Sequence, residues 1–366
     1  MKPNRPYLSV IVPAHQGAGV LPRSLTSLMA SDLPRECWEL IVVDDASTDE
    51  TALIAAQYAD TVVRLPGRPH GPAYARNRGF EVARGEIIVF TDADVSVHAD
   101  TLRRFAEVFC QEPDVSAVFG AYDDEPEEKG LVTEYRNLLH HYVHNQNAGD
   151  AETFWAGCGA VRAGVFREAG MYDEWHYSRP QIEDIELGHR IRAIGHRIAL
   201  RPQIQAKHLK RWTLRQVIRT DLNDRGVPWT RFLIMQGQAI KSRTLNLRAI
   251  ERINTALVAF GIFFIFGAAV RLDLRWLIPT VLCILPVMLS NSQLYGFFLR
   301  SRGLLFMLGV IPLNLLYYAL NNVSFAFGWL LHGTVGGPRP DPAVDAFSEV
   351  GVQTWPPVPA KRKIPA

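Results

Sequence analysis

The chain has 366 residues, of which 48% are hydrophobic and 21% are charged, and its net charge is +2. This length exceeds that of a typical single domain, so we expect one catalytic unit with an appended segment. Basic side chains are concentrated between Lys207 and Arg252, a stretch that contains eleven Lys or Arg residues and three acidic ones. The rest of the chain is therefore acidic, which argues against nucleic-acid binding. The basic block suits anionic lipid headgroups or phosphate, and a solvated helical face is the alternative.

Cysteine usage predicts a reducing environment. Cys37, Cys110, Cys158 and Cys283 lie far apart in the sequence, without the spacing of a metal site. No cleavable signal peptide precedes Tyr7. We therefore expect a catalytic domain that faces the cytoplasm.

Residues 7–122 alternate between two kinds of pattern. Short apolar or β-branched runs predict buried strands at 8–12, 39–43, 61–64, 86–90 and 115–120. Helical spacing lies between them, at 20–30, 50–58, 73–83 and 99–111. This alternation predicts an α/β fold with right-handed crossovers and a mostly parallel sheet. Ligands in such sheets bind at the carboxyl ends of the strands, so we expect the loops at 13–19, 44–49, 66–72 and 91–95 to form one pocket.

The sequence after residue 122 indicates three further regions. We assign 123–211 to the second half of a domain that covers 1–211, with its first half at 7–122. Residues 212–252 hold two short amphipathic patterns, broken at Gly226 and Pro228, which predict basic helices in the headgroup layer. Packing of these helices against the catalytic domain is the alternative. The Pro-rich tail at 333–366 lacks periodicity and is predicted to be disordered.

A transmembrane region is predicted at 253–332. Three uncharged stretches, 253–270, 276–299 and 304–331, are long enough to cross a hydrocarbon core of ~30 Å at ~1.5 Å per residue. Two prolines, Asn291 and Gln293 also allow the second stretch to be re-entrant. With three spans the tail lies opposite the catalytic domain, and with two it lies on the same side. Basic residues at 300 and 302 favour three spans, whereas those at 361–363 favour two.

The first chemical motif is Thr91-Asp92-Ala93-Asp94, at the end of an apolar strand. Two aspartates one residue apart can hold a hard divalent cation and leave coordination positions for diphosphate oxygens. The alternative is a turn in which an aspartate caps the helix near Ala99.

Two loops at the same predicted edge add further candidates. Asp44 and Asp45 follow the second strand and can accept hydrogen bonds from a base or ribose. Ser47 and Glu50 beside them fit a capping box at a helix start. Arg76 lies in a helix behind a Gly/Pro-rich loop and can face a diphosphate, with a plain surface arginine as the alternative.

Glu183 and Asp184 begin a helical pattern about ninety residues beyond the aspartate pair. Acidic residues at a helix start commonly stabilise the helix dipole. Activation of an acceptor, however, needs one carboxylate within hydrogen-bond reach of the nucleophile, which makes this pair a candidate for the base. His208 can be a metal ligand or a phosphate contact, although a lone histidine is more often neither.

Six motifs in order resemble the family-2 inverting glycosyltransferases of GT-A fold, over residues 7 to 212. They are Ser9-Val10-Ile11-Val12-Pro13-Ala14, Val43-Asp44-Asp45-Ala46-Ser47-Thr48-Asp49, Ala75-Arg76-Asn77-Arg78-Gly79, Thr91-Asp92-Ala93-Asp94, Gly170-Met171-Tyr172-Asp173-Glu174 and Glu183-Asp184-Ile185-Glu186-Leu187. The resemblance implies a catalytic domain with a Rossmann-like sheet flanked by helices, in which 7–122 is the nucleotide-sugar half and 123–211 is the acceptor half. It also assigns site residues: Pro13, Ala14, Asp45 and Arg76 to the nucleotide, Asp92 and Asp94 to the donor and a divalent cation (Mn²⁺ or Mg²⁺), Asp184 to the catalytic base, and His208 to the metal or diphosphate.

The chain also departs from the family pattern. His15-Gln16 stands where the family often has an aromatic residue and Asn, and Gly157-Cys158-Gly159 varies a Gly-rich acceptor loop. His208-Leu209-Lys210-Arg211-Trp212 is similar to the Gln-x-x-Arg-Trp signature of processive synthases with its first residue changed. Gly157, Lys210, Arg211 and Trp212 therefore join the candidate substrate-binding residues. Three spans are few for a polymer-conducting channel, so we expect transfer of a single sugar.

We therefore predict a multi-pass inner-membrane glycosyltransferase that uses a nucleotide sugar, with UDP favoured by the resemblance. The predicted acceptor is lipid-linked, and a cell-envelope glycan or glycolipid hydroxyl is the alternative. A nucleotidyltransferase lacks support because no Gly-rich, Lys-containing signature is present near the N-terminus. A non-catalytic nucleotide-binding membrane protein would have no need of Asp92, Asp94 and Asp184 together.

Overall fold

The structure, a computed structural model, describes residues 6–237, 249–340 and 353–355. The chain forms two compact units. The first contains Met1–Glu127, Ala148–Leu209 and Pro340–Ala366, and the second contains Glu128–Asn147 and Lys210–Arg339.

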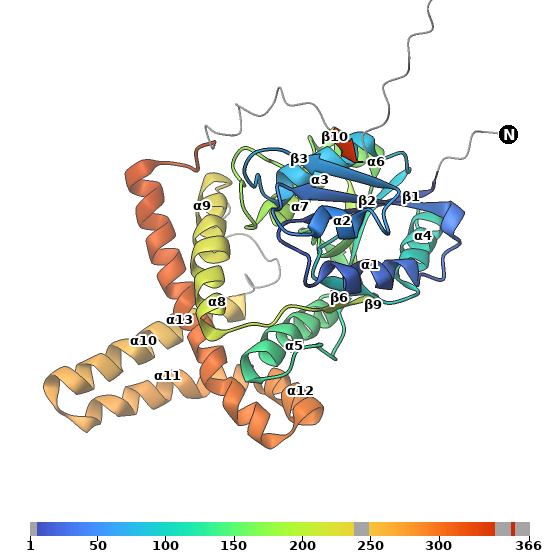
Figure 1. Cartoon of the computed structure of the whole chain (residues 1–366). Helices are drawn as coiled ribbons and strands as arrows, with labels where there is room; N and C mark the ends of the chain where they lie inside the picture. Colours follow the sequence, from blue (N-terminus) through green and yellow to red (C-terminus); the bar gives the residue numbers. More distant parts are fainter. Residues whose placement is uncertain (1–5, 238–248, 341–352, 356–366) are drawn as a thin grey trace, which may run out of the picture. The chain divides into compact units, whose positions relative to one another are not determined.

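The first unit is a mixed sheet flanked by helices (Figure 1). The strand order is β10-β3-β2-β1-β4-β8-β6-β9-β5, and β7 pairs with β9. The strands are β1 (Leu8–Ala14), β2 (Trp38–Asp45), β3 (Thr61–Leu65), β4 (Ile87–Thr91), β5 (Val95–Val97), β6 (Val115–Tyr122), β7 (Gly149–Ala151), β8 (Cys158–Arg162), β9 (Arg197–His208) and β10 (Gln353–Trp355). The helices are α1 (Leu21–Met29), α2 (Thr51–Ala55), α3 (Pro72–Val82), α4 (Thr101–Gln111), α6 (Ala163–Glu168) and α7 (Glu183–Ala193).

The strands and helices predicted for residues 7–122 are confirmed as β1, β2, β3, β4, β6 and α1 to α4. The predicted parallel pairing holds for β3, β2, β1 and β4. Beyond β4 the sheet is mixed, because β8 runs antiparallel to both β4 and β6. The parallel half places the loops after β1, β2 and β4 at one edge of the sheet.

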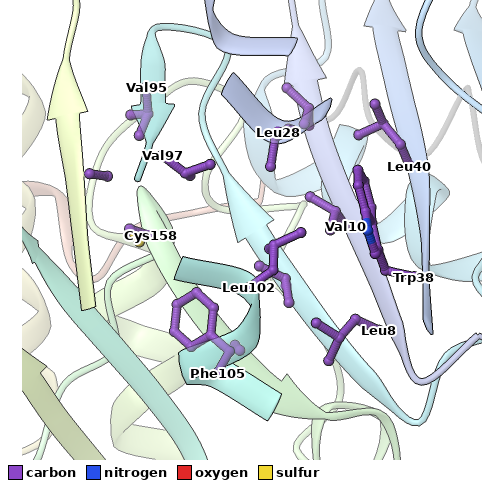
Figure 2. Packing of buried hydrophobic residues seen from close by; sticks show 14 of the residues in the cluster. Leu8, Val10, Leu28, Trp38, Leu40, Val95, Val97, Leu102, Phe105 and Cys158 are labelled. Carbon is purple, nitrogen blue, oxygen red and sulfur yellow. The ribbon is translucent and has the colours of Figure 1, made fainter. Parts of the chain in front are cut away.

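The main core of this unit fills the space between the sheet and helices α1 and α4 (Figure 2). On α4, the buried residues Leu102, Phe105 and Phe109 recur at spacings of three and four, which place them on one helix face. Leu8 and Val10 of β1 are buried in the same cluster. Each such side chain contributes about 2 kcal/mol by leaving water, so this core fixes the strands that carry the site.

The second unit is helical. Its helices are α5 (Leu131–Gln146), α8 (Leu214–Arg219), α9 (Val227–Met235), α10 (Ala249–Arg271), α11 (Leu277–Ser290), α12 (Ser292–Arg302) and α13 (Leu304–Val335). A π-helical segment, Thr220–Gly226, joins α8 to α9. Helix α5 belongs here and not with the predicted acceptor half, because its Tyr135 and Leu138 pack with Phe298 and Val310.

By length and composition, α10 and α13 can each cross a membrane. They correspond to the first and third predicted stretches. The second stretch is a pair of helices, Leu274–Ser290 and Ser292–Arg302, bent by 63°, and by length and composition alone it is a third candidate only if this pair counts as one span.

The predictions for the interface helices at 212–252 and for the tail at 333–366 are each wrong in part. The expected break at Gly226 and Pro228 is wrong, because the π-helical segment carries the helix through from Leu214 to Met235. In the predicted disordered tail, 333–335 end α13 and 353–355 form β10 against β3. Residues 341–352 and 356–366 of that tail, and 238–248 of the predicted interface helices, lie outside the described residues.

Candidate active site

Asp92 and Asp94 lie in the short turn between β4 and β5. The Val95 N–H donates to the Asp92 carbonyl at 3.0 Å, and the Leu209 N–H donates to the Asp94 carbonyl at 2.8 Å. The two carboxylate side chains remain 36% and 31% exposed. Helix α4 begins only at Thr101, so neither aspartate caps it. The turn presents both carboxylates at the sheet edge.

Arg76, on α3, joins two of the sequence motifs. Its Nη2 lies 2.6 Å from Asp92 Oδ1, and its Nη1 lies 3.3 Å from Glu183 Oε1. Burial alone would lower the pKa of Arg76, but the neighbouring carboxylates, Asp92 foremost, raise it overall and keep the guanidinium charged. The surface-arginine alternative is wrong, since the side chain is only 4% exposed.

Asp184 is the second residue of α7 and is half-buried. Its Oδ2 accepts a hydrogen bond from the Ala156 N–H at 3.3 Å, and its Oδ1 accepts one from the Ile185 N–H at 2.8 Å. Burial, reinforced by the adjacent Glu183 carboxylate, raises the pKa of Asp184 to about 7. A carboxylate that only stabilised a helix dipole would have a lowered pKa. This environment suits a group that takes up a proton near neutral pH.

His208 ends β9 beside Asp94, with Nε2 3.5 Å from Asp94 Oδ2. Its ring stacks on Tyr122 with centroids 4.6 Å apart, and Tyr122 meets Trp155 edge-on at 4.8 Å. The Trp155 indole lies over Gly157, where a Cβ would be 2.5 Å from the ring. Gly157 is therefore required by close packing. Tyr122 and Trp155 are not among the predicted site residues, because isolated aromatic residues beside strand ends form no motif.

The predicted metal ligands are only partly brought together. Within 6–237, 249–340 and 353–355, no group of three or more His, Cys, Asp or Glu side chains could hold a metal ion. Asp94 and His208 are adjacent, whereas Asp92 is paired with Arg76. Two protein ligands of this kind fit a cation that takes its remaining ligands from substrate phosphates. They do not fit a cation enclosed by protein alone.

Asp44 and Asp45 end β2 with buried carboxylates. Asp45 accepts hydrogen bonds from the backbone N–H groups of His70 and Gly71 at 2.8 to 3.0 Å. Asp44 accepts from the Ser47 N–H at 3.1 Å and from Arg64 Nε at 3.3 Å. These carboxylates therefore fix the neighbouring loops, and their contact with a nucleotide stays a prediction.

The remaining predicted residues fall at different places. Pro13 and Ala14 end β1 and pair with the end of β2. The capping box predicted at Ser47 is wrong: α2 begins at Thr51, and the Ser47 hydroxyl accepts the Gln16 N–H at 3.0 Å.

Lys210, Arg211 and Trp212 belong to the second unit. There the Lys210 ammonium lies 4.3 Å from the centroid of the Trp212 ring. Their assignment to substrate stays a prediction.

The chain is similar in sequence to known proteins. Residues 9–170 match the family model described as glycosyl transferase family 2. The chain is 35% identical over 99 residues to the poly(ribitol-phosphate) beta-N-acetylglucosaminyltransferase TarS of Staphylococcus aureus, covering 26% of this chain and 17% of TarS. It is 38% identical over 104 residues to the succinoglycan biosynthesis protein ExoO of Rhizobium meliloti, covering 28% of this chain and 29% of ExoO. The chain thus spans less than a third of the length of either relative.

One solved structure extends the likeness to both units. The mannosyltransferase PcManGT from Pyrobaculum calidifontis, in complex with GDP-Man and Mn²⁺, matches with a TM-score of 0.57 and 21% identity over 87% of each chain. At this identity the match shows the fold. Residues 9–170 are therefore similar to glycosyl transferase family 2 domains, the chain shares the fold of that mannosyltransferase, and apolar helices follow the matched residues.

Proposed function

We propose that this chain is a membrane-bound inverting glycosyltransferase that transfers one sugar from a nucleotide sugar to a lipid-linked acceptor. Asp184 is the base, Arg76 and Asp92 hold the donor diphosphate side, and Asp94 with His208 binds a divalent cation. The observation that carries the proposal is the Arg76 bridge. It unites Asp92 with the Glu183-Asp184 pair, although Arg76 and Glu183 are 107 residues apart in sequence.

The proposed reaction is a single displacement at the anomeric carbon. Asp184 takes the proton of the acceptor hydroxyl, the acceptor oxygen bonds to the anomeric carbon, and the bond from that carbon to the diphosphate oxygen breaks. The nucleoside diphosphate leaves, and the configuration of the sugar inverts. A divalent cation bound by Asp94 and His208 would neutralise charge on the departing diphosphate.

The surroundings of Asp184 support its role as the base. Its two backbone hydrogen-bond donors come from Ala156 and Ile185, which hold its carboxylate in one orientation. Glu183 is engaged by Arg76 and by the Gln181 N–H at 2.8 Å. It is therefore less available to take a proton, and we propose that it orients Arg76.

The apolar helices support a membrane location, and with it a lipid-linked acceptor. A phosphate acceptor needs little deprotonation, so with a polyprenyl phosphate Asp184 would orient the acceptor. A hydroxyl acceptor needs the base. TarS is a poly(ribitol-phosphate) glycosyltransferase, so an envelope-glycan hydroxyl is the second acceptor class to test.

The test uses the full chain purified in detergent, a panel of UDP- and GDP-sugars, and either polyprenyl phosphate or a soluble glycan. Release of nucleoside diphosphate is measured with Mn²⁺, with Mg²⁺ and with chelator. We expect acceptor-dependent release that needs the cation and falls about 10²-fold in Asp94→Ala, as loss of a metal contact at the leaving group predicts. Equal, metal-independent rates in wild type and Asp94→Ala would reject the metal assignment.

A further inference from the structure

Helices α10 and α11 form an antiparallel hairpin. A Cβ at Gly261 would lie 3.2 Å from Ile284, and one at Gly267 would lie 2.5 Å from the Trp276 ring, so the two helices approach closely along their length. The hairpin surface is apolar, with Phe263 and Leu282 among many exposed side chains. Such a surface is unfavourable in water and suits lipid.

The tip of the hairpin is charged. Arg271, Asp273 and Arg275 follow one another there, and Leu272 beside them is 92% exposed. An arginine left in the hydrocarbon centre would cost about 3 kcal/mol. From Glu251 to Arg271, α10 extends about 30 Å at 1.5 Å per residue, which matches the hydrocarbon thickness. The shorter α11 is accommodated by local thinning of the bilayer and by Arg275 extending toward the headgroups.

The base of the hairpin is polar and is centred on Tyr318 of α13. The Tyr318 hydroxyl donates to Glu251 Oε2 at 3.0 Å and accepts from the side-chain amides of Asn254 at 3.2 Å and Asn291 at 3.1 Å. Ser290 donates to Asn254 at 3.0 Å. The first turns of α10 and the last turn of α11 therefore meet at one level, so α11 returns to the side from which α10 starts.

The amino-terminal end of α13 packs on helices that precede α10. Val310 packs with Tyr135 and Leu138 of α5, and α5 carries Glu134, which pairs with Arg302 at 2.8 Å. Such a charged helix belongs outside the hydrocarbon.

The carboxyl-terminal end of α13 also packs on helices that precede α10. A Cβ at Gly226 would lie 2.2 Å from Ser324 Oγ, and one at Gly328 would lie 2.8 Å from Thr230. Arg231 donates to the Gly336 carbonyl at 2.8 Å. Among the described residues, no candidate span precedes α10. Both ends of α13 thus contact helices that precede the hairpin, and its centre contacts the polar base of the hairpin.

The tail supplies an independent constraint. Strand β10 pairs with β3 in the catalytic sheet, and Figure 1 shows it at that edge. Residues before and after the apolar helices therefore share one sheet, so the chain crosses the membrane an even number of times between them.

From these observations we infer that α10 and α11 are the two membrane-crossing helices, and that α13 does not cross but lies along the bilayer surface at the base of the hairpin. This inference rests on the membrane attachment of the proposed function. One side of α13 carries the exposed side chains Leu305, Leu308, Val323, Phe327 and Leu330, which share a helix face at 3.6 residues per turn. That face enters the lipid, while Val310, Tyr318, Ser324 and Gly328 face protein.

The inferred arrangement also accounts for the positions of basic residues relative to the membrane. With a crossing hairpin and a surface α13, the basic residues at 300–302 lie on the same side as those at 207–231. A single side thus holds both clusters, as the distribution of positive charge in membrane proteins favours.

The experiment labels introduced cysteines in the full chain in cells, in a background in which Cys37, Cys110 and Cys283 are alanine and only the buried Cys158 is kept. Four variants are compared with a membrane-impermeant maleimide, before and after permeabilisation: Gly164→Cys on the catalytic unit, Leu272→Cys at the tip, and Arg300→Cys and Gly333→Cys near the two ends of α13. An added Cβ meets no atom within 4 Å at Gly164 or Gly333. We expect Leu272→Cys to label from one side and the other three from the opposite side, each by at least tenfold.

Two labelling patterns would overturn the inference. Labelling of Arg300→Cys and Gly333→Cys from opposite sides would mean that α13 spans. Labelling of Leu272→Cys from the side of Gly164→Cys would mean that the hairpin does not cross. Release of the chain from membranes by alkaline carbonate is a separate outcome, which would instead remove the membrane attachment on which the proposed function depends.

Discussion

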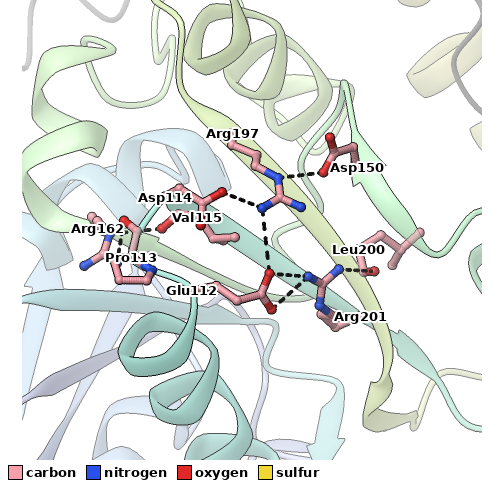
Figure 3. Close-up of polar contacts among 9 residues, drawn as sticks. All are labelled: Glu112, Pro113, Asp114, Val115, Asp150, Arg162, Arg197, Leu200 and Arg201. Atoms are coloured by element: carbon pink, nitrogen blue, oxygen red, sulfur yellow. Dashed lines mark hydrogen bonds and ion pairs between the residues drawn. The ribbon is translucent and has the colours of Figure 1, made fainter.

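Two arginine-carboxylate clusters of the catalytic sheet show how a candidate site differs from scaffold. Arg76 is buried and contacts Asp92 and Glu183, with the Asp184 carboxylate close behind. Arg197, by contrast, is about one-third exposed and pairs with Asp114 at 2.6 Å and Asp150 at 2.7 Å (Figure 3). In each cluster one arginine contacts more than one carboxylate. Only in the first are the arginine and one of its carboxylate partners buried, since Arg76 is 4% and Glu183 is 6% exposed.

The two environments shift carboxyl groups in opposite directions. Burial, with help from Glu183, raises the pKa of Asp184 to about 7. The hydrogen bond from Arg197 lowers the pKa of Asp114. Folding thus works against the charged form of Asp184 and favours the charged form of Asp114. A carboxyl group whose charged form is disfavoured in the folded protein marks a functional site more reliably than an arginine-carboxylate pair does.

The largest expected effect is that of Asp184→Asn on turnover. Loss of a general base typically costs about 10³-fold, measured as kcat with a hydroxyl acceptor. The same change should raise the melting temperature at pH 8, because it removes a charge from a half-buried site, by an amount that corresponds to about 1 kcal/mol after solvent screening. The gain should shrink at pH 5 and vanish below about pH 4, because the fold loses stability as the pH rises from the ordinary pKa of an aspartate to the raised pKa of Asp184.

The matched control is Asp114→Asn. Asp114 lies outside the candidate site, so its substitution should leave turnover within about twofold. Because the pKa of Asp114 is lowered, the substitution should not raise the melting temperature at pH 8. Stabilisation by both substitutions, or by neither, would remove the contrast between the two clusters.

Arg76→Gln should have the second-largest effect. Removing one partner from a buried ion pair leaves uncompensated charge and costs about 3 kcal/mol of unfolding free energy. Because Arg76 lowers the pKa of Asp184, its loss should also move the pH at which activity falls to a higher value. A variant that lost stability but kept the wild-type pH profile would show that Arg76 acts on the fold alone.

Sequence patterns predict the motif residues of the Arg76 cluster, but they do not predict how these residues contact one another. Asp92, Asp94 and Asp184 stand in motifs at strand or helix ends, and β1 to β4 follow from short apolar runs. The Arg76 bridge depends on contacts over long sequence separations, which no local pattern encodes. The same holds for α5, whose residues Tyr135 and Leu138 pack with helices 150 or more residues later in the chain. Asp45 is the converse case, since its motif is visible but its carboxylate holds a loop.

The pH dependence of turnover comes next in size. Only deprotonated Asp184 can take a proton, so kcat with a hydroxyl acceptor should fall about tenfold per pH unit below pH 7 and level off above it. With a polyprenyl phosphate as acceptor the profile should be flatter. A flat profile with both acceptors between pH 5 and 8 would argue against Asp184 as the base.

A smaller effect is expected at Tyr122, which stacks on His208. Tyr122→Leu should raise the Mn²⁺ concentration for half-maximal activity about tenfold, because groups that orient a metal ligand tune its affinity. Tyr122→Phe keeps the ring and should leave that concentration nearly unchanged. Equal effects of both substitutions would point to the hydroxyl instead of the stack.

The smallest effect is expected for Arg197→Gln, the same substitution as at Arg76 but in the exposed cluster. Its pairs with Asp114 and Asp150 are held in water, where attraction is weak and the side chains lose entropy on pairing. The melting temperature should stay within about 2 °C of wild type at low salt, and the difference should disappear at 1 M salt, where charges are screened beyond ~3 Å. A loss comparable to that of Arg76→Gln would mean that burial is not what separates the two clusters, and that Arg197 instead anchors β7 and the end of β6 to β9.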